Sequence, residues 1–238
     1  MNSFDFSPIG HITSCYKEKF GIPRQPGLVS LAKAQLILKQ DFTEECIRSL
    51  QGFSHLWLSF VFHGNQQKAW KALVRPPRLG GDSKVGVFAS RSPFRPNPLG
   101  LSVVKLEEIE IKNARVILHL SGCDLLDETP VLDIKPYLPY VDSISDAMGG
   151  FAHHKPDKKL DVVFTEEANM QCQLQSEQLG QDLHALIEQI LQLDPRPSYQ
   201  QGESGDRVYA MKLYDFDLRW QYCENKKIKV LSLLDSRV

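Results

Sequence analysis

The chain has 238 residues, a formal net charge of -1 and 42% hydrophobic residues, which is ample for a folded core. This charge balance excludes a protein that is basic throughout, although it permits a local basic patch. The five cysteines are far apart, which argues against a disulfide framework or a zinc site, and we expect no bound metal. No segment has the apolar length of a membrane span and the first residues lack signal-peptide features, so we expect a cytoplasmic protein without membrane contact.

The first 62 residues predict two strands separated by a loop and a short helix. Apolar residues recur from Phe4 to Cys15 and predict the first strand. The loop that follows presents Arg24 between two prolines, and Asp41-Phe-Thr-Glu44 has the spacing of a capping box that starts a short helix. The apolar, aromatic run 56–62 predicts a strand buried on both faces.

The most informative segment is a proline- and arginine-rich stretch from residue 75 to residue 98. A single acid, Asp82, stands there against five cations: Arg75, Arg78, Lys84, Arg91 and Arg95. Five prolines fix backbone torsions and remove amide donors, so the arginines are presented on stiff backbone that is neither helix nor central strand. Such a segment is typical of a site for a carboxylate, a phosphate or a nucleobase. The alternative is a solvated loop that holds arginines by chance.

The remainder of the chain predicts a hairpin, an irregular region and a second, smaller unit. Residues 101–111 and 114–120 form the expected hairpin around Lys112-Asn113. Residues 122–140 are irregular, and a flexible loop is expected over 143–159. Beyond a short strand at 160–164, Thr165 opens a helical region that ends before Pro195. Residues 207–213, 216–222 and 228–234 predict three antiparallel strands.

These elements indicate a mainly β protein. Six or more strands with non-helical connections predict an antiparallel β-barrel domain over residues 1–164, and residues 165–238 are expected to form a small α+β domain. A dinucleotide-binding βαβ fold is disfavoured, because no strand is followed by a Gly-x-Gly-x-x-Gly motif that opens a helix.

Four basic residues are candidates for ligand binding. The planar guanidinium groups of Arg91, Arg95 and Arg24 can each bind a carboxylate or a phosphate. His63 ends an apolar strand, where its ring either hydrogen-bonds a ligand or caps the strand.

A group of carboxylates follows the hairpin: Asp124, Asp127, Glu128 and Asp133. Only Asp127 and Glu128 adjoin the irregular Thr129-Pro130 turn, and contacts to an organic ligand are favoured over a magnesium site. No catalytic triad or cysteine–histidine pair can be argued from spacing.

In the tail, aromatic rings and cations have the chemistry of a site for unpaired nucleobases. The alternative is an ordinary aromatic core in a small sheet. The residues expected to bind a nucleic acid substrate are Arg196, Tyr199, Arg219 and Trp220, together with Arg95 from the central loop.

Several motifs resemble the TrmO (TsaA/YaeB-like) family of S-adenosylmethionine-dependent tRNA methyltransferases, which are built on a β-barrel. They are Pro23-Arg-Gln-Pro-Gly, Val74-Arg-Pro-Pro-Arg-Leu-Gly-Gly, Gly86-Val-Phe-Ala-Ser-Arg-Ser-Pro-Phe-Arg-Pro-Asn-Pro-Leu-Gly, Thr129-Pro-Val-Leu-Asp-Ile-Lys-Pro-Tyr and Asp194-Pro-Arg-Pro-Ser-Tyr. The chain departs from the family pattern at Ser90, where relatives have threonine, and at Glu128, where relatives have glycine.

The resemblance implies methyl transfer to N6 of threonylcarbamoyladenosine beside the tRNA anticodon, by a homodimer that binds S-adenosylmethionine near the subunit interface. The cofactor contacts it implies are Arg24, Gln25, Pro26, His63, Gly64, Arg91, Leu101, Asp127, Glu128, Thr129, Pro130 and Val131. No residue is an obvious base for the target nitrogen, so the substrate's carbamoyl group or water could accept the proton. Two alternatives remain at this point: a non-catalytic RNA-binding module, and an enzyme or sensor for a carboxylated nucleoside.

Overall fold

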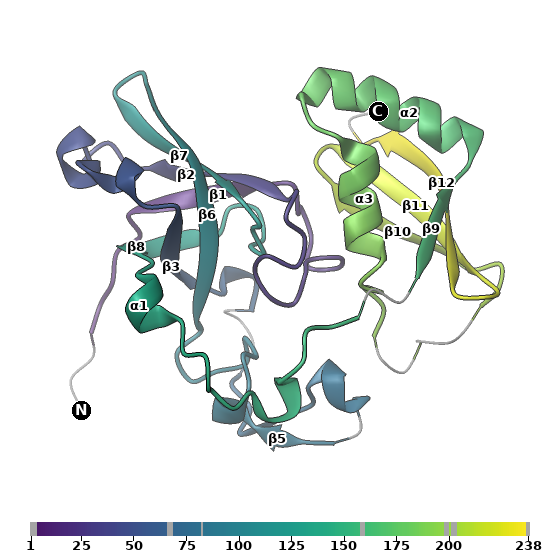
Figure 1. The fold of residues 1–238 in the computed structure, drawn as a ribbon, viewed down its shortest axis with the longest axis horizontal. Helices are drawn as coiled ribbons and strands as arrows, with labels where there is room; N and C mark the ends of the chain where they lie inside the picture. Colours follow the sequence, from purple (N-terminus) through teal and green to yellow (C-terminus); the bar gives the residue numbers. More distant parts are fainter. Residues whose placement is uncertain are drawn as a thin grey trace.

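The computed structural model describes residues 4–65, 69–81, 83–157, 160–197, 200 and 204–236. It consists of a β-barrel unit followed by a smaller α+β unit (Figure 1). Six antiparallel strands close the barrel in the order β1-β2-β7-β6-β3-β8. Their bounds are β1 Gly10–Ser14, β2 Lys33–Leu38, β3 His55–Val61, β6 Leu99–Lys112, β7 Arg115–Ser121 and β8 Pro130–Pro136. The expected mainly β fold with an antiparallel barrel is confirmed.

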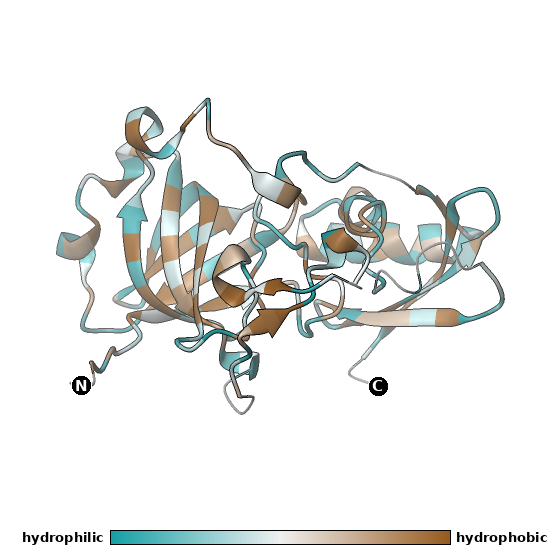
Figure 2. Ribbon diagram, turned by 90° about the horizontal axis from the view of Figure 1, so that it is seen from below, coloured by the Kyte–Doolittle hydropathy of each residue, from teal (hydrophilic) through white to brown (hydrophobic). Residues whose placement is uncertain are grey.

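Alternating side chains fill the barrel. On β3, Leu56, Leu58 and Phe60 are buried in the barrel core, whereas Trp57 and Ser59 between them are only partly buried. The expectation that this strand is buried on both faces is therefore wrong, because a closed barrel has one inner face and its outer face meets solvent or loops. The alternation is visible as bands of hydropathy along the barrel strands in Figure 2.

The expected hairpin is β6–β7, and it turns at Asn113 and Ala114 with φ of 52° and 58°. Two barrel strands went unrecognised. Lys33–Leu38 is a short alternating strand, and Pro130–Pro136 carries a proline at each end and two charges that mask its pattern. The segment expected to start a helix at Asp41 instead forms the short 3-10 helices η1 Glu44–Ile47 and η2 Leu50–Gly52, and Thr43 makes no side-chain cap hydrogen bond.

Between β3 and β6 the chain leaves the barrel in an excursion that carries the arginine- and proline-rich segment. Its elements are η3 His63–Asn65, β4 Leu73–Val74, η4 Pro77–Leu79, β5 Val85–Gly86 and η5 Val87–Ala89. The excursion lies below the barrel in Figure 1. No described residue of this excursion is in an α-helix, as the prolines predict.

The C-terminal unit is a four-stranded sheet with two helices on one face (Figure 1). After α1 Pro139–Asp142 and η6 Gly150–Ala152, its elements are β9 Asp161–Phe164, α2 Glu166–Leu179, α3 Leu183–Leu191, β10 Val208–Leu213, β11 Phe216–Cys223 and β12 Lys227–Asp235. The Thr165 hydroxyl caps α2, and Gly180 in the left-handed region (φ 61°) separates the two helices. β9 pairs in parallel with β12 and therefore belongs to the C-terminal sheet. The expected domain boundary at residue 164 assigned this strand to the barrel domain instead.

The loop after β1 joins the two units. Cys15, Tyr16, Val29 and Ala32 are buried in the core of the C-terminal unit rather than in that of the barrel. The backbone amide of Tyr214 donates to the carbonyl of Cys15 at 2.7 Å. The C-terminal unit therefore supports the loop that carries Arg24.

Candidate functional site

A pocket of about 940 Å³ opens on the barrel unit. Its walls come from Phe6 and from five segments that are distant in sequence: the loop 19–26, β3 with η3, the loop 90–95, the start of β6 and the segment 124–133. Every described lining residue lies between positions 6 and 133, so none of the described residues of the C-terminal unit forms a wall. Three of the five motifs noted in the sequence contribute to this pocket, namely those that begin at Pro23, Gly86 and Thr129.

Nine of the residues expected to bind cofactor or substrate line this pocket. They are Arg24, Gln25, Pro26, His63, Gly64, Arg91, Arg95, Leu101 and Thr129. The structure thus gathers most of the sequence-derived site into one cavity.

Asp127, Glu128, Pro130 and Val131 do not line it. Asp127 accepts a hydrogen bond from the amide of Ser14 at 2.8 Å and pairs with Lys17 at 2.7 Å, so it braces the turn against β1. Glu128 has φ 60°, a left-handed backbone conformation that favours glycine. The Val131 side chain is fully buried in the barrel core. Of the residues of this turn, only Thr129 lines the pocket.

Of the four carboxylates after the hairpin, the sequence singled out the two that adjoin the Thr129-Pro130 turn, but the other two lie at the pocket. Asp124 and Asp133 line the pocket, whereas Asp127 and Glu128 do not. Closeness to the turn in sequence therefore did not predict which carboxylates line the pocket, because the backbone changes direction at each residue of a turn. Among described residues, no three histidine, cysteine or acidic side chains are grouped closely enough to hold a metal ion.

Arg91 and Arg95 of the central loop make different hydrogen bonds. Arg91 donates from Nη1 to Oε1 of Gln25, which joins two walls of the pocket. Arg95 instead donates to the main-chain oxygen of Ser90 at 2.6 Å and to that of Val87 at 3.3 Å. Arg91 is the better candidate for contact with an anionic ligand group, and Arg95 holds the loop in shape.

His63 and Thr129 meet across the pocket. The buried Thr129 hydroxyl donates to the carbonyl of Leu126 at 2.6 Å, and its oxygen lies 3.4 Å from Nδ1 of His63. Because the hydroxyl proton is already used, this long contact favours a proton on Nδ1 and leaves Nε2 as an acceptor.

Gly100 and Gly64 allow neighbouring side chains to lie close to the backbone at the pocket. A Cβ at Gly100 would lie 2.1 Å from the ring of Phe60, so only glycine admits that ring against β6. Gly64 is approached by Lys19, whose ammonium donates to the Gly64 carbonyl and to Oδ1 of Asn65 at 2.8 Å. Neither Lys19 nor Phe60 stands out in the sequence, because lysines and aromatic strand residues are common.

Asp124 is the most unusual side chain of the pocket. The buried Ser102 donates its hydroxyl proton to Oδ1 of Asp124 at 2.6 Å. Burial raises the pKa of Asp124 to about 6, although the hydrogen bond from Ser102 and the charge of Arg91 act in the opposite direction. Sequence reasoning placed Asp124 in a carboxylate cluster but gave it no individual role, since its burial depends on barrel closure.

Two of the expected nucleic acid contacts in the tail are wrong. Trp220 is fully buried in the core of the C-terminal unit. Arg196 is 3% exposed, pairs with Asp194 at 2.9 Å and lies 3.4 Å from the ring centroid of Tyr222. Arg219 is exposed on β11, and Tyr199 lies outside the described residues. The aromatic-core interpretation of this tail is the correct one for Trp220.

Arg196 nevertheless has a link to the pocket. Its main-chain oxygen lies 3.5 Å from Nη2 of Arg24, at the limit of a hydrogen bond. The buried Arg196–Asp194 pair thus supports the outer side of a pocket-lining loop.

Comparison with known proteins agrees with this architecture. The model of the tRNA-methyltransferase O N-terminal domain matches residues 11–143, and that of the TrmO C-terminal domain matches residues 157–236. The chain is 47% identical over 222 residues to a tRNA (adenine(37)-N6)-methyltransferase of Escherichia coli (strain K12), covering 93% of this chain and 94% of that protein. It is 46% identical over 144 residues to the human protein of the same name, covering 59% of this chain and 32% of that protein.

A solved structure is similar over almost the full length of the chain. The crystal structure of TrmO from Pseudomonas aeruginosa superimposes with a TM-score of 0.82 at 41% identity, covering 98% of both chains. No described helix is both long and apolar enough to cross a membrane. With both domain models matched and a relative covered almost end to end, the chain belongs to the TrmO family.

Proposed function

We propose that this protein is an S-adenosylmethionine-dependent methyltransferase that methylates N6 of adenosine 37 in tRNA, beside the anticodon, on a base that already carries threonylcarbamoyl. The observation that carries the proposal is the gathering of Arg91, Gln25, His63 and Thr129 around one pocket in a chain that spans both TrmO domains. A relative that bears the corresponding enzyme name is 47% identical to it over 222 residues. Its proposed substrate, tRNA, leads us to propose a cytoplasmic location.

The chemistry of the pocket fits S-adenosylmethionine. Arg91 offers a guanidinium for the carboxylate of the methionine part, and apolar walls at Phe60, Leu101 and Leu126 suit the adenine ring. When bound, the cofactor supplies an activated methyl group, and the protein supplies position and charge.

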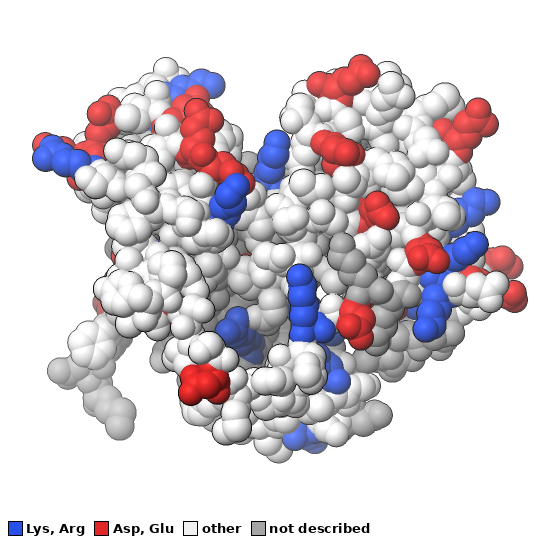
Figure 3. All heavy atoms as spheres, in the orientation of Figure 1, with Lys and Arg blue, Asp and Glu red and all other residues white. Residues whose placement is uncertain are grey.

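A tRNA substrate also needs cations outside the pocket. Arg75, Arg78 and Lys84 are exposed on the excursion, and the chain as a whole is nearly neutral. In Figure 3, basic side chains gather in the middle and lower part of the displayed face, between the two units and over the excursion, whereas many acidic side chains lie along the top. We assign contact with the RNA backbone to the excursion, with Arg219 as a separate candidate on the C-terminal unit.

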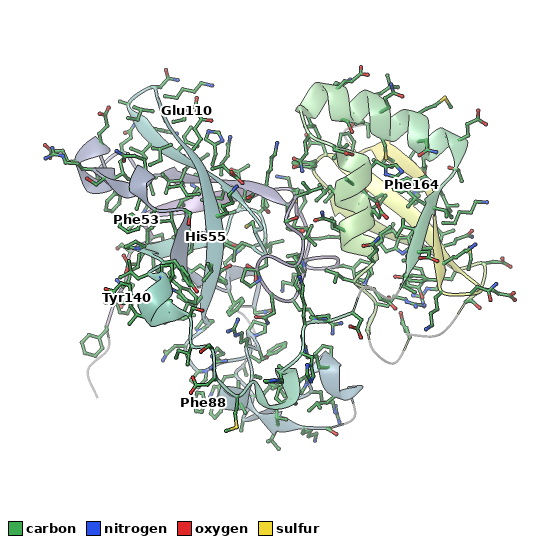
Figure 4. The ribbon with its side chains drawn as sticks, in the orientation of Figure 1. Phe53, His55, Phe88, Glu110, Tyr140 and Phe164 are labelled. Atoms are coloured by element: carbon green, nitrogen blue, oxygen red, sulfur yellow. The ribbon has the colours of Figure 1, made fainter. Side chains whose placement is uncertain are left out.

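We also propose that the protein acts as a homodimer. Beyond β8 the chain exposes Tyr140 at 85%, Ile144 at 66% and Met148 at 94%, and Phe88 on the excursion is exposed at 77%. Figure 4 shows Tyr140 and Phe88 at the periphery of the barrel unit. Several large apolar side chains exposed on one unit are typical of a protein–protein interface, and we propose that a second copy of the chain binds there.

The test of the activity is transfer of a labelled methyl group from S-adenosylmethionine to bulk tRNA. Substrate tRNA is prepared from strains with and without threonylcarbamoylation, and anticodon-loop nucleosides are analysed by mass spectrometry. We expect label only on N6 of the modified base. Binding of tRNA without transfer would identify an RNA-binding module, and cofactor binding without tRNA affinity would identify a small-molecule enzyme or sensor.

A further inference from the structure

Asp124 lies in the pocket in a setting suited to proton transfer. It lines the pocket together with Gly100 and Leu101, and its Oδ1 accepts a hydrogen bond from the hydroxyl of Ser102, a residue only 1% exposed on β6. The serine holds the carboxylate in one orientation while the carboxylate remains accessible from the cavity. Its burial and its hydrogen bond from Ser102 distinguish Asp124 from an acid on the solvated surface.

The groups that face Asp124 leave it ionised near neutral pH. Burial raises its pKa to about 6, opposed by Ser102 and by the positive charge of Arg91. Its other ionisable neighbours are Tyr16 and Cys123, and burial raises the pKa of both, so they stay neutral. A carboxylate with this pKa is a stronger base than an exposed one and is still mostly ionised at pH 7.

The proposed reaction requires such an acceptor. In threonylcarbamoyladenosine the N6 lone pair is delocalised into the adjoining carbonyl, so this nitrogen becomes a good nucleophile only as its proton leaves. We propose, on the basis of the proposed methyltransferase function, that Asp124 is the catalytic base that accepts the N6 proton. The N6–methyl bond forms as the sulfur–methyl bond breaks, the bonding pair stays on sulfur, and the N6 proton forms a carboxylic acid at Asp124.

The charge balance favours Asp124 over the other groups in the pocket. Proton transfer to a carboxylate removes a negative charge in the same step in which the sulfonium loses its positive charge. Transfer to His63 would instead create a new cation in a pocket that is already lined by Lys19, Arg24, Arg91 and Arg95. Asp133 is 50% exposed and is paired with Lys135, so its charge is already compensated.

The test combines single-turnover kinetics with a direct titration. Enzyme in excess over tRNA and saturating S-adenosylmethionine are mixed between pH 5 and 8.5, using wild-type protein, Asp124→Asn and Ser102→Ala. In the cofactor-free protein, carbon NMR of labelled aspartate carboxyls measures the pKa of Asp124. Glu107→Gln is the matched control, because Glu107 also accepts a hydrogen bond from a serine, Ser121, but lies outside the pocket.

We expect the wild-type rate to rise with pH through the pKa of about 6 and then level off. Asp124→Asn should lower the plateau by about 100-fold or more and abolish this inflection, while the dissociation constant for S-adenosylmethionine changes less than threefold. Ser102→Ala should move both the NMR titration and the kinetic inflection to higher pH. Glu107→Gln should behave as wild type.

Two results would overturn the proposal. An Asp124→Asn variant that keeps the wild-type rate and inflection would show that another group takes the proton. A variant that loses cofactor affinity but keeps its saturated rate would make Asp124 a cofactor contact. Failure of the proposed function would be distinct, because the wild-type protein itself would then transfer no methyl group to tRNA.

Discussion

Arg91 and Gln25 are 66 positions apart in sequence and meet through a hydrogen bond at the pocket. Arg91→Ala is expected to weaken S-adenosylmethionine binding by about 1.5–3 kcal/mol, because a charge-assisted hydrogen bond to the ligand is lost. Calorimetric titration measures the effect, with Arg115→Ala at the exposed β6–β7 hairpin as control. An unchanged dissociation constant would remove Arg91 from the cofactor site.

Asp124 makes the stability of the protein depend on pH. Its pKa rises from 3.8 to about 6 on folding, so the folded state binds the proton more tightly than the unfolded state does. Its contribution is therefore most favourable below pH 4 and is lost as pH rises through 6. Asp124→Asn should be more stable than wild type at pH 8, by at most about 3 kcal/mol, and nearly equal to it at pH 4. Urea unfolding at the two pH values decides this, and equal differences at both would refute it.

At the scale of elements, the loop after β1 makes the two units interdependent. Tyr16 and Val29 are buried among side chains of α3 and the C-terminal sheet, although both residues precede β2 in the barrel unit. Arg24 and Gln25 lie between them and line the pocket. Damage to the C-terminal core is therefore expected to reach the proposed cofactor site through this loop.

Arg196→Ala tests this dependence. It leaves Asp194 buried without its guanidinium partner, and loss of one member of a buried ion pair costs about 3–5 kcal/mol. We expect a large fall in stability and weaker cofactor binding in thermal and calorimetric measurements. Arg219→Ala, an exposed arginine of the same unit, should change stability by no more than about 0.5 kcal/mol. Equal stability of the two variants would contradict the structural role of Arg196.

At the scale of the whole molecule, exposed apolar side chains predict self-association. Tyr140→Glu combined with Met148→Glu should convert a dimer into a monomer in sedimentation equilibrium, because two charges would have to be buried at the interface. Leu174→Glu is the control, since Leu174 is 60% exposed on α2, and Figure 1 shows α2 in the C-terminal unit, away from α1, which carries Tyr140. A wild-type protein that is an active monomer at assay concentration would end this proposal.

The excursion and the β6–β7 hairpin lie at opposite ends of the barrel unit (Figure 1), which allows a matched test of RNA contact. Arg75→Ala with Arg78→Ala should weaken tRNA binding and make its salt dependence shallower by about 1.5 in the double-logarithmic slope. Lys112→Ala with Arg115→Ala removes the same charge from the hairpin and should leave the slope unchanged. Equal slopes for both double variants would move the RNA contact elsewhere.

Local patterns were sufficient for much of the fold. The β6–β7 hairpin, the three strands of the tail and the capped start of α2 depend on alternation, turn residues and a hydroxyl cap, all of which act over a few residues. Local patterns did not identify β8, because its prolines and charges are not typical of a strand. Its strand conformation depends on pairing with the neighbouring strands β1 and β3.

The sequence by itself determined that this is a mainly β protein of the TrmO family with a stiff, arginine-rich loop, because motifs and prolines act locally. Only the tertiary structure decided that Asp124, rather than Asp127, faces the pocket, and that Arg196 and Trp220 are buried instead of exposed to RNA. The physical reason is that the environment of a side chain is set by the elements that close around it. Barrel closure and the packing of α3 on the sheet bring together residues that no local pattern connects.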